Sequence, residues 1–245
     1  MRVLLSLLVL AFAFQARAGD FAERTIIGFS PDAKLFAFSE HGIQDGSGRP
    51  YLSVYVIETE NDRWLTGTPI RKVAAAGETT GLSDAAGLAL IRAEAMSELD
   101  ASTNVTEWTY HRAASRSPWQ FDGDGQTISG EARPFTPPRR NGPTFRIAAT
   151  DVAPSSTAED GPCYDLKKPQ RLRIFELNPT GETPRIWHDE DRPPESRGCP
   201  SDYRFGDIVT APRSEPTVAA LLVFYETIGF EGPDGRWIAV TGTLR

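Results

Sequence analysis

The stretch Gly28–Glu58, GFSPDAKLFAFSEHGIQDGSGRPYLSVYVIE, decides the fold class of this chain. It contains the turn Ser30–Lys34, in which proline takes the second position and aspartate the third. Leu35–Ser39 is apolar on both faces and is predicted to be a buried strand. After a loop rich in glycine, aspartate and serine, Tyr51–Glu58 carries the aromatic and β-branched residues that are typical of strands. The chain therefore begins with β structure.

Further strand-like runs recur along the chain, and turn residues separate them. The longest apolar run, Val218–Tyr225, is predicted to be a buried strand, whereas Arg112–Pro143 is loop-like with room for short strands. This pattern predicts a mainly-β fold, either a sandwich, a barrel or a partial propeller-like sheet arrangement. The other runs are Thr25–Phe29, Phe145–Thr150, Arg171–Leu177, Tyr203–Val209, Thr217–Thr227 and Arg236–Thr243.

One amphipathic helix is predicted over residues 83–100. Ser83 can cap its first turn, and Asp84 suits the positive end of the helix dipole. The apolar residues Leu88, Ile91, Ala95 and Leu99 recur at helical spacing and define one face. We expect the helix to pack on a sheet by that face.

Residues 1–18 have the three parts of a secretory signal peptide. A positively charged start precedes the apolar run Val3–Phe14, and Ala16 and Ala18 form a small-residue cleavage box before Gly19. An uncleaved anchor is the alternative, but the apolar run spans only about 18 Å at 1.5 Å per residue, against roughly 30 Å for the hydrocarbon core. No cysteine follows the box, which argues against a lipid anchor. We expect cleavage between Ala18 and Gly19.

The composition of the remaining chain narrows the function classes. Cleavage removes two arginines and no acidic residue, so the formal net charge changes from −7 to −9. An acidic chain is a poor candidate for nucleic-acid binding, and no later segment is long and apolar enough to span a membrane. Residues 19–245 are expected to form a single secreted mainly-β domain without a stable membrane anchor.

The two cysteines, Cys163 and Cys199, both follow the signal and lie in segments with glycine and proline. Exported proteins fold in an oxidising compartment, and the chain has no C-x-x-C pair or paired histidines for a zinc site. We therefore predict a disulfide between them. It would close a loop of about 37 residues and contribute about 4 kcal/mol in the chain-entropy model.

Three segments contain residues of the kind that bind ligands or metals. Asp122–Gln126 resembles the start of a calcium loop, but Arg133 stands where an EF-hand needs an acidic residue, so a solvated turn is favoured. Trp187–Asp191 offers one imidazole and three carboxylates, but consecutive strand residues point to opposite faces, which favours an acidic solvated loop. A proline-rich basic stretch could present guanidinium groups to an anion, or it could be a solvated surface loop. Its arginines are Arg133, Arg139, Arg140 and Arg146.

No complete catalytic, cofactor or metal motif is present. His41 near Asp45 and Ser47 could contribute to a dispersed hydrolytic site, while His111 lies apart in sequence. The five tryptophans are spaced as core and sheet residues rather than as a sugar-binding platform. They are Trp64, Trp108, Trp119, Trp187 and Trp237.

Several segments resemble a family of secreted bacterial proteins, domain of unknown function 2259. The likeness is carried by Gly28–Trp64 with its QDGSG motif, by Cys199-Pro200 leading into Tyr203-Arg204, and by GFEGPDGR at Gly229–Arg236. Ala33 stands where the family usually has glycine. The resemblance implies secretion and a shared fold, and it carries over no catalytic residue.

Residues 28–64 also resemble a blade of TolB-type periplasmic propellers. A weak internal echo links Phe29–Ser39 with Glu231–Thr241, since both contain Pro-Asp followed by a small residue, a basic residue and an apolar strand. The echo indicates either two similar hairpin turns or a blade-type repeat.

The sequence thus predicts an exported, periplasmic and non-catalytic protein that binds an unknown protein or envelope component. No cofactor, nucleic acid or metal is expected. The alternative is a hydrolase whose active-site residues come from dispersed loops.

Overall fold

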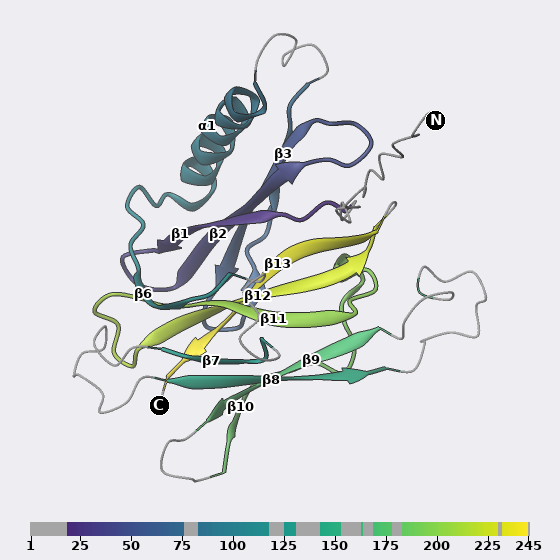
Figure 1. Ribbon diagram of the computed structural model, residues 1–245. Helices are drawn as coiled ribbons and strands as arrows, with labels where there is room; N and C mark the ends of the chain where they lie inside the picture. Colours follow the sequence, from purple (N-terminus) through teal and green to yellow (C-terminus); the bar gives the residue numbers. More distant parts are fainter. Residues whose placement is uncertain are drawn as a thin grey trace, which may run out of the picture.

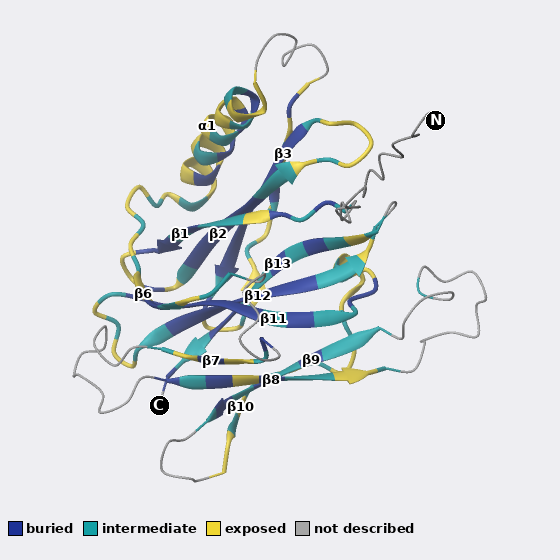
Figure 2. Cartoon of the chain, viewed as in Figure 1, coloured by how far each residue is buried: buried dark blue, intermediate teal, exposed yellow. Residues whose placement is uncertain are grey.

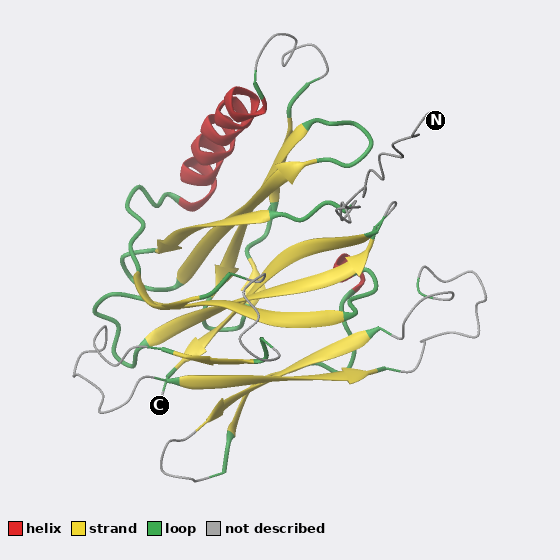
Figure 3. Cartoon of the chain, in the orientation of Figure 1, coloured by secondary structure: helices red, strands yellow, loops and turns green. Residues whose placement is uncertain are grey.

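The computed structural model describes residues 19–75, 83–117, 125–130, 143–152, 163, 169–177, 183–229 and 232–244. Within these residues the chain forms thirteen strands in three antiparallel sheets, one α-helix and one short 3-10 helix (Figures 1 and 3). The predicted mainly-β class with one helix is confirmed. The described strands form stacked open sheets, as in a sandwich, and do not close into a barrel.

The first five strands form the N-terminal sheet, in which β1-β2-β3-β4 are neighbours and β5 also pairs with β3. The turn predicted before β2 is present, because the Asp32 carboxylate accepts hydrogen bonds from the Ser30 hydroxyl (2.7 Å) and the Lys34 amide (3.2 Å). The strand bounds are β1 Glu23–Phe29, β2 Leu35–Ile43, β3 Pro50–Glu58, β4 Arg63–Trp64 and β5 Ile70–Val73.

The helix α1 (Asp84–Thr103) covers one face of the N-terminal sheet, as predicted (Figure 2). The Ser83 side chain accepts a hydrogen bond from the Ala86 amide, which confirms the cap. The helix buries Ile91, Ala95 and Leu99 together with alternate residues of β3, and Leu88 packs against them from the margin.

The remaining strands form two further sheets. The central sheet has the order β13-β12-β11-β6, and the outer sheet has the order β10-β9-β8-β7. The central strands are β6 His111–Ser115, β11 Asp202–Thr210, β12 Val218–Ile228 and β13 Pro233–Thr243. The outer strands are β7 Thr127–Ser129, β8 Thr144–Asp151, β9 Gln170–Leu177 and β10 Arg185–Asp189, and the 3-10 helix η1 (Glu195–Arg197) follows β10.

The central sheet lies between the other two and is buried on both faces. Along β12, Leu222 and Phe224 pack with the N-terminal sheet, whereas Leu221 and Val223 pack with the outer sheet. A strand that is covered on both sides needs apolar residues at successive positions. This double coverage explains the uninterrupted apolar run in the sequence of β12.

Carboxylates of the N-terminal sheet cap the outer edge of β13. Glu40 on β2 accepts a hydrogen bond from the Trp237 amide (3.0 Å), and Asp62, in the turn before β4, accepts one from the Thr241 amide (2.7 Å). An uncapped edge strand offers unpaired amides to other chains. The two carboxylates therefore protect this edge and join the two sheets.

A buried ion pair makes a third connection between these sheets. Arg24 on β1 pairs with Asp207 on β11, whose side chain is only 1% exposed. The Arg24 guanidinium also lies 4.0 Å above the ring of Trp237. Asp207 has a second, longer contact with the half-exposed Arg112 (3.6 Å), so loss of Arg24 would leave the buried carboxylate with this weaker contact alone.

Two predictions about local structure are wrong. Pro233–Gly235 was expected to form a turn like that of Ser30–Lys34, but these residues lie inside β13 and pair with Glu226–Ile228 of β12. Long-range pairing has therefore overridden the local turn preference, and the internal echo does not correspond to two equivalent turns. The acidic segment Trp187–Asp191 was expected to be a solvated loop, but its first three residues belong to β10.

Candidate functional site

An open groove of about 400 Å³ lies between the N-terminal sheet and the ends of β12 and β13, with η1 forming a third wall. Alternate residues of β3 line it, because 51, 53 and 55 face the groove while 52, 54 and 56 face α1. Ligand sites in proteins commonly have volumes of about 300–1,000 Å³. The groove is therefore large enough for a small molecule.

Glu40 forms part of the groove lining and is almost completely buried (3% exposed). Its Oε1 atom accepts a hydrogen bond from the Tyr55 hydroxyl (2.6 Å), and its Oε2 atom accepts the hydrogen bond from the Trp237 amide described above. Burial raises the pKa of Glu40, although both hydrogen bonds favour the ionised form. Glu40 is thus held in one position by donors from both sheets.

A second polar group of the lining joins the N-terminal segment to β13. The Asp20 carboxylate accepts hydrogen bonds from the Tyr51 hydroxyl (2.9 Å) and from Nη2 of Arg236 (2.8 Å). Burial raises the pKa of Asp20 despite the nearby positive charge of Arg236. The guanidinium also lies 5.6 Å from the ring centroid of Tyr51. This side of the groove is therefore rigid and already satisfied in hydrogen bonding.

A polar row crosses the N-terminal sheet along its groove face. Glu40 on β2 pairs in register with Ser53 on β3, and Ser53 pairs with Arg71 on β5. Tyr225 on β12 also lines the groove. Among the described residues, neither Ser53, Arg71 nor Tyr225 has a hydrogen-bond or ion-pair partner. These three side chains are available to a ligand.

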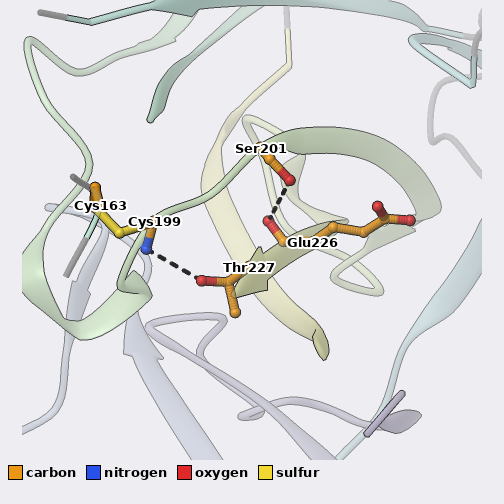
Figure 4. Close-up of a disulfide and its surroundings, with 5 residues drawn as sticks. All are labelled: Cys163, Cys199, Ser201, Glu226 and Thr227. Atoms are coloured by element: carbon orange, nitrogen blue, oxygen red, sulfur yellow. Dashed lines mark hydrogen bonds between the residues drawn. A yellow bond between two sulfur atoms is a disulfide. The ribbon is translucent and has the colours of Figure 1, made fainter. Parts of the chain in front are cut away.

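The disulfide between Cys163 and Cys199, predicted from the sequence, is present and lies behind the wall formed by η1. The Cα atoms of the two cysteines are 5.7 Å apart. The Cys199 amide donates a hydrogen bond to the Thr227 hydroxyl (3.1 Å), and Thr227 itself lines the groove (Figure 4). The disulfide segment is thereby tied to the end of β12.

The imidazole of His188 on β10 lies between two carboxylates. Nδ1 is 3.4 Å from Asp62, and Nε2 is 3.5 Å from Glu190. Burial disfavours the charged imidazolium, but the contacts with Asp62 and Glu190 outweigh this effect and raise the pKa of His188 to about 9. We call these three residues the His188 clamp. It connects the β3–β4 turn with the outer sheet.

The clamp corrects the sequence interpretation of Trp187–Asp191. His188 is 20% exposed and Glu190 is 11% exposed, so this part of the segment is not a solvated acidic loop. Glu190 also accepts hydrogen bonds from Nη1 of Arg197 (2.8 Å) and from the Leu172 amide (2.7 Å). The prediction failed because Asp62, the partner of His188, lies far away in the sequence.

The dispersed hydrolytic site does not assemble among the described residues. His41 lies on the α1 side of β2, where Nε2 is 3.6 Å from Glu23, and burial and the charge of Arg92 lower its pKa. Ser47 instead donates a hydrogen bond to the Gln44 side chain (3.0 Å), and no described contact joins His41 to Asp45 or Ser47. His111 is exposed at the start of β6.

Other predicted segments fall partly outside the described residues. Residues 1–18 and 122–124, Trp119 and three of the four arginines of the basic stretch lie there. Arg146 is exposed on β8, 5.8 Å from the ring centroid of Phe175. Trp237 is buried, Trp108 and Trp187 are partly buried, and Trp64 is 42% exposed against the ring of Tyr55.

The described residues contain no cluster of three or more histidine, cysteine, aspartate or glutamate side chains suited to a metal ion. Within the same part of the chain, no helix has the length and apolar character needed to cross a membrane.

Sequence reasoning missed the groove because its residues come from separate strands. One signal was present: Glu40 directly follows the apolar run of a predicted buried strand, and charged residues are seldom buried unless they are paired. A second signal was the alternation of Tyr51, Ser53 and Tyr55, which puts polar groups on one face of a buried strand. Neither signal indicates which residues of β12 and β13 lie opposite.

Stacked antiparallel sheets, a disulfide and a polar groove define a mainly-β protein suited to an oxidising compartment. Residues 37–243 match the model of the family described as predicted secreted protein (DUF2259), and the chain belongs to this family. Its description supports secretion. The comparison with curated proteins found no match, and neither did the comparison with solved structures. The likeness of residues 28–64 to a TolB-type blade gains no support from these comparisons.

Proposed function

We propose that this protein is a periplasmic, non-catalytic binding module and that its ligand occupies the groove. The observation that carries the proposal is the contrast within the groove lining. Glu40, Asp20 and Arg236 are fixed by hydrogen bonds, whereas Ser53 and Tyr225 have none among the described residues. A fixed polar frame around a few available donors is typical of ligand sites that form before the ligand arrives.

The position of the groove supports the same function. The disulfide segment and the capped edge of β13 hold two of its walls, so a ligand would meet a preorganised surface. Preorganisation lowers the entropic cost of binding. Secretion, which the family description supports, places such a surface where components of the envelope can reach it.

The test is capture by the exported protein from an envelope extract of the producing organism. Species released from the washed protein on denaturation are identified by mass spectrometry, and the wild type is compared with Val73→Trp. Val73 is 41% exposed and lines the groove, so tryptophan there obstructs the mouth without disturbing the core. Ile186→Trp is the matched control, because Ile186 is 54% exposed on the distant strand β10.

The proposal predicts a species that is enriched on the wild type and on Ile186→Trp and lost from Val73→Trp. Equal enrichment on all three proteins would place binding elsewhere. A parallel screen with ester and glycoside substrates tests the hydrolase alternative. Turnover by the wild type that is abolished in His41→Ala, with no species captured, would replace the binding module by a hydrolase.

A further inference from the structure

The cations of the groove lining outnumber its carboxylates, although the chain as a whole is acidic. Three of the four cations already have carboxylate partners: Lys72 with Glu98 (2.7 Å), Arg197 with Glu190 (2.8 Å) and Arg236 with Asp20 (2.8 Å). The fourth, Arg71, is exposed at the rim and has no ion-pair partner among the described residues. Arg71 is therefore the one cation of the lining without a carboxylate partner among the described residues, while Glu40 is held by the Tyr55 hydroxyl and the Trp237 amide.

Two neutral hydroxyl groups accompany this charge. Ser53 is 7% exposed and is the cross-strand neighbour of Arg71, and residues paired in this way have Cβ atoms about 4.5–5.5 Å apart. Tyr225 is 6% exposed and enters the groove from the central sheet. Neither hydroxyl oxygen is fully buried, because both side chains line the open groove. Both hydroxyls can therefore donate a hydrogen bond to a ligand in the groove.

We infer that the groove binds a small organic acid, whose carboxylate contacts the Arg71 guanidinium while Ser53 and Tyr225 donate hydrogen bonds to its oxygen atoms. This inference rests on the proposed function of the groove. A guanidinium presents two parallel N–H donors that match the two oxygens of a carboxylate. The single unpaired cation suits a single negative charge. A phosphate dianion would place a second negative charge near the carboxylates of Glu40 and Asp20, and the described lining has no further unpaired cation to bind that charge.

The experiment titrates the exported protein with matched acid and amide probes. The pairs are glucuronic acid with glucuronamide, and N-acetyl-Ala-Ala with its C-terminal amide, and inorganic phosphate is a separate arm. The arginine side-chain Nε–H signals are followed by NMR, with Arg71 assigned from Arg71→Gln. Arg63→Gln is the matched control, because Arg63 is exposed on β4 of the same sheet and does not line the groove.

At least one acid should shift the Arg71 signal saturably and bind at least tenfold more tightly than its amide. Arg71→Gln should weaken that acid at least tenfold, Tyr225→Phe should weaken it severalfold, and Arg63→Gln should leave it unchanged. The inference fails if acid and amide bind alike, if Arg71→Gln binds as the wild type does, if phosphate binds more tightly than both acids, or if neither acid binds. The capture experiment with Val73→Trp distinguishes failure of this inference from failure of the proposed function. If Val73→Trp loses the captured species, the groove is still the binding site even when no organic acid binds there.

Discussion

Replacing His188 by glutamine tests how far the His188 clamp stabilises the fold. The pKa of His188 is about 9 in the folded protein, against 6.5 for an ordinary histidine. A group whose pKa is raised in the folded state stabilises the protein fully at pH values below the pKa that the group has in the unfolded state. This contribution is lost as the pH rises through the pKa of the folded state. At about 1.4 kcal/mol per pKa unit, protonation of His188 contributes about 3 kcal/mol at pH 6, about 1.4 at pH 8 and below about 0.5 at pH 9.

The assay is urea unfolding of the exported protein with its disulfide intact, followed by circular dichroism between pH 6 and pH 9. His188→Gln should lower the free energy of unfolding by about 3 kcal/mol at pH 6, because a neutral side chain then faces two carboxylates, and the difference should shrink towards pH 9. His111→Gln is the matched control, since His111 is exposed, and it should change stability by no more than about 0.5 kcal/mol throughout. The reasoning is refuted if His188→Gln costs the same free energy at pH 6 and pH 9, which would indicate a packing effect, or if it costs nothing.

Three further predictions concern the remaining connections between the sheets. Arg24→Leu should destabilise the fold by about 3 kcal/mol in urea unfolding, because it leaves the buried Asp207 with only its longer contact to the half-exposed Arg112 (3.6 Å); a loss below about 1 kcal/mol would contradict this account of the ion pair. Glu40→Gln should become progressively more stable relative to the wild type as the pH rises above 4.5, because burial raises the pKa of Glu40 and the neutral amide has no charge to bury; a difference that does not change with pH would rule this out. Replacing both Cys163 and Cys199 by alanine should cost about 2–4 kcal/mol, and thiol titration of the denatured, unreduced wild type should find no free thiol.

Much of the fold could be predicted because its signals are local. The β12 sequence is apolar at successive positions, which matches a strand covered on both faces, and α1 has both its cap at Ser83 and its apolar stripe. Pro233–Gly235 shows the limit of such signals. Its residues favour a turn, but eleven paired positions between β12 and β13 hold it in a strand. The energy of that pairing comes from residues that the turn motif does not contain.

The candidate site could not be predicted for the same reason. Glu40 is recognisable as an unusual charge beside apolar residues, but its donors are the adjacent strand's Tyr55 and the distant Trp237. The segment of His188 and Glu190 resembled a solvated acidic loop because Asp62, the partner of His188, lies in the β3–β4 turn beside another sheet. Sequence patterns identify the faces of strands, whereas a site between sheets depends on which faces meet.

The groove as ligand site is tested most directly by fluorine NMR of the exported protein labelled with 3-fluorotyrosine. Six tyrosines are present, of which Tyr51, Tyr55 and Tyr225 line the groove and Tyr110 does not. When the small-molecule fraction of the envelope extract is added, we expect saturable shifts of the Tyr225 resonance and of at least one of the other two groove resonances, while that of Tyr110 stays unchanged. A shift of Tyr110 with Tyr225 unmoved, or no shift of any tyrosine, would contradict binding in the groove.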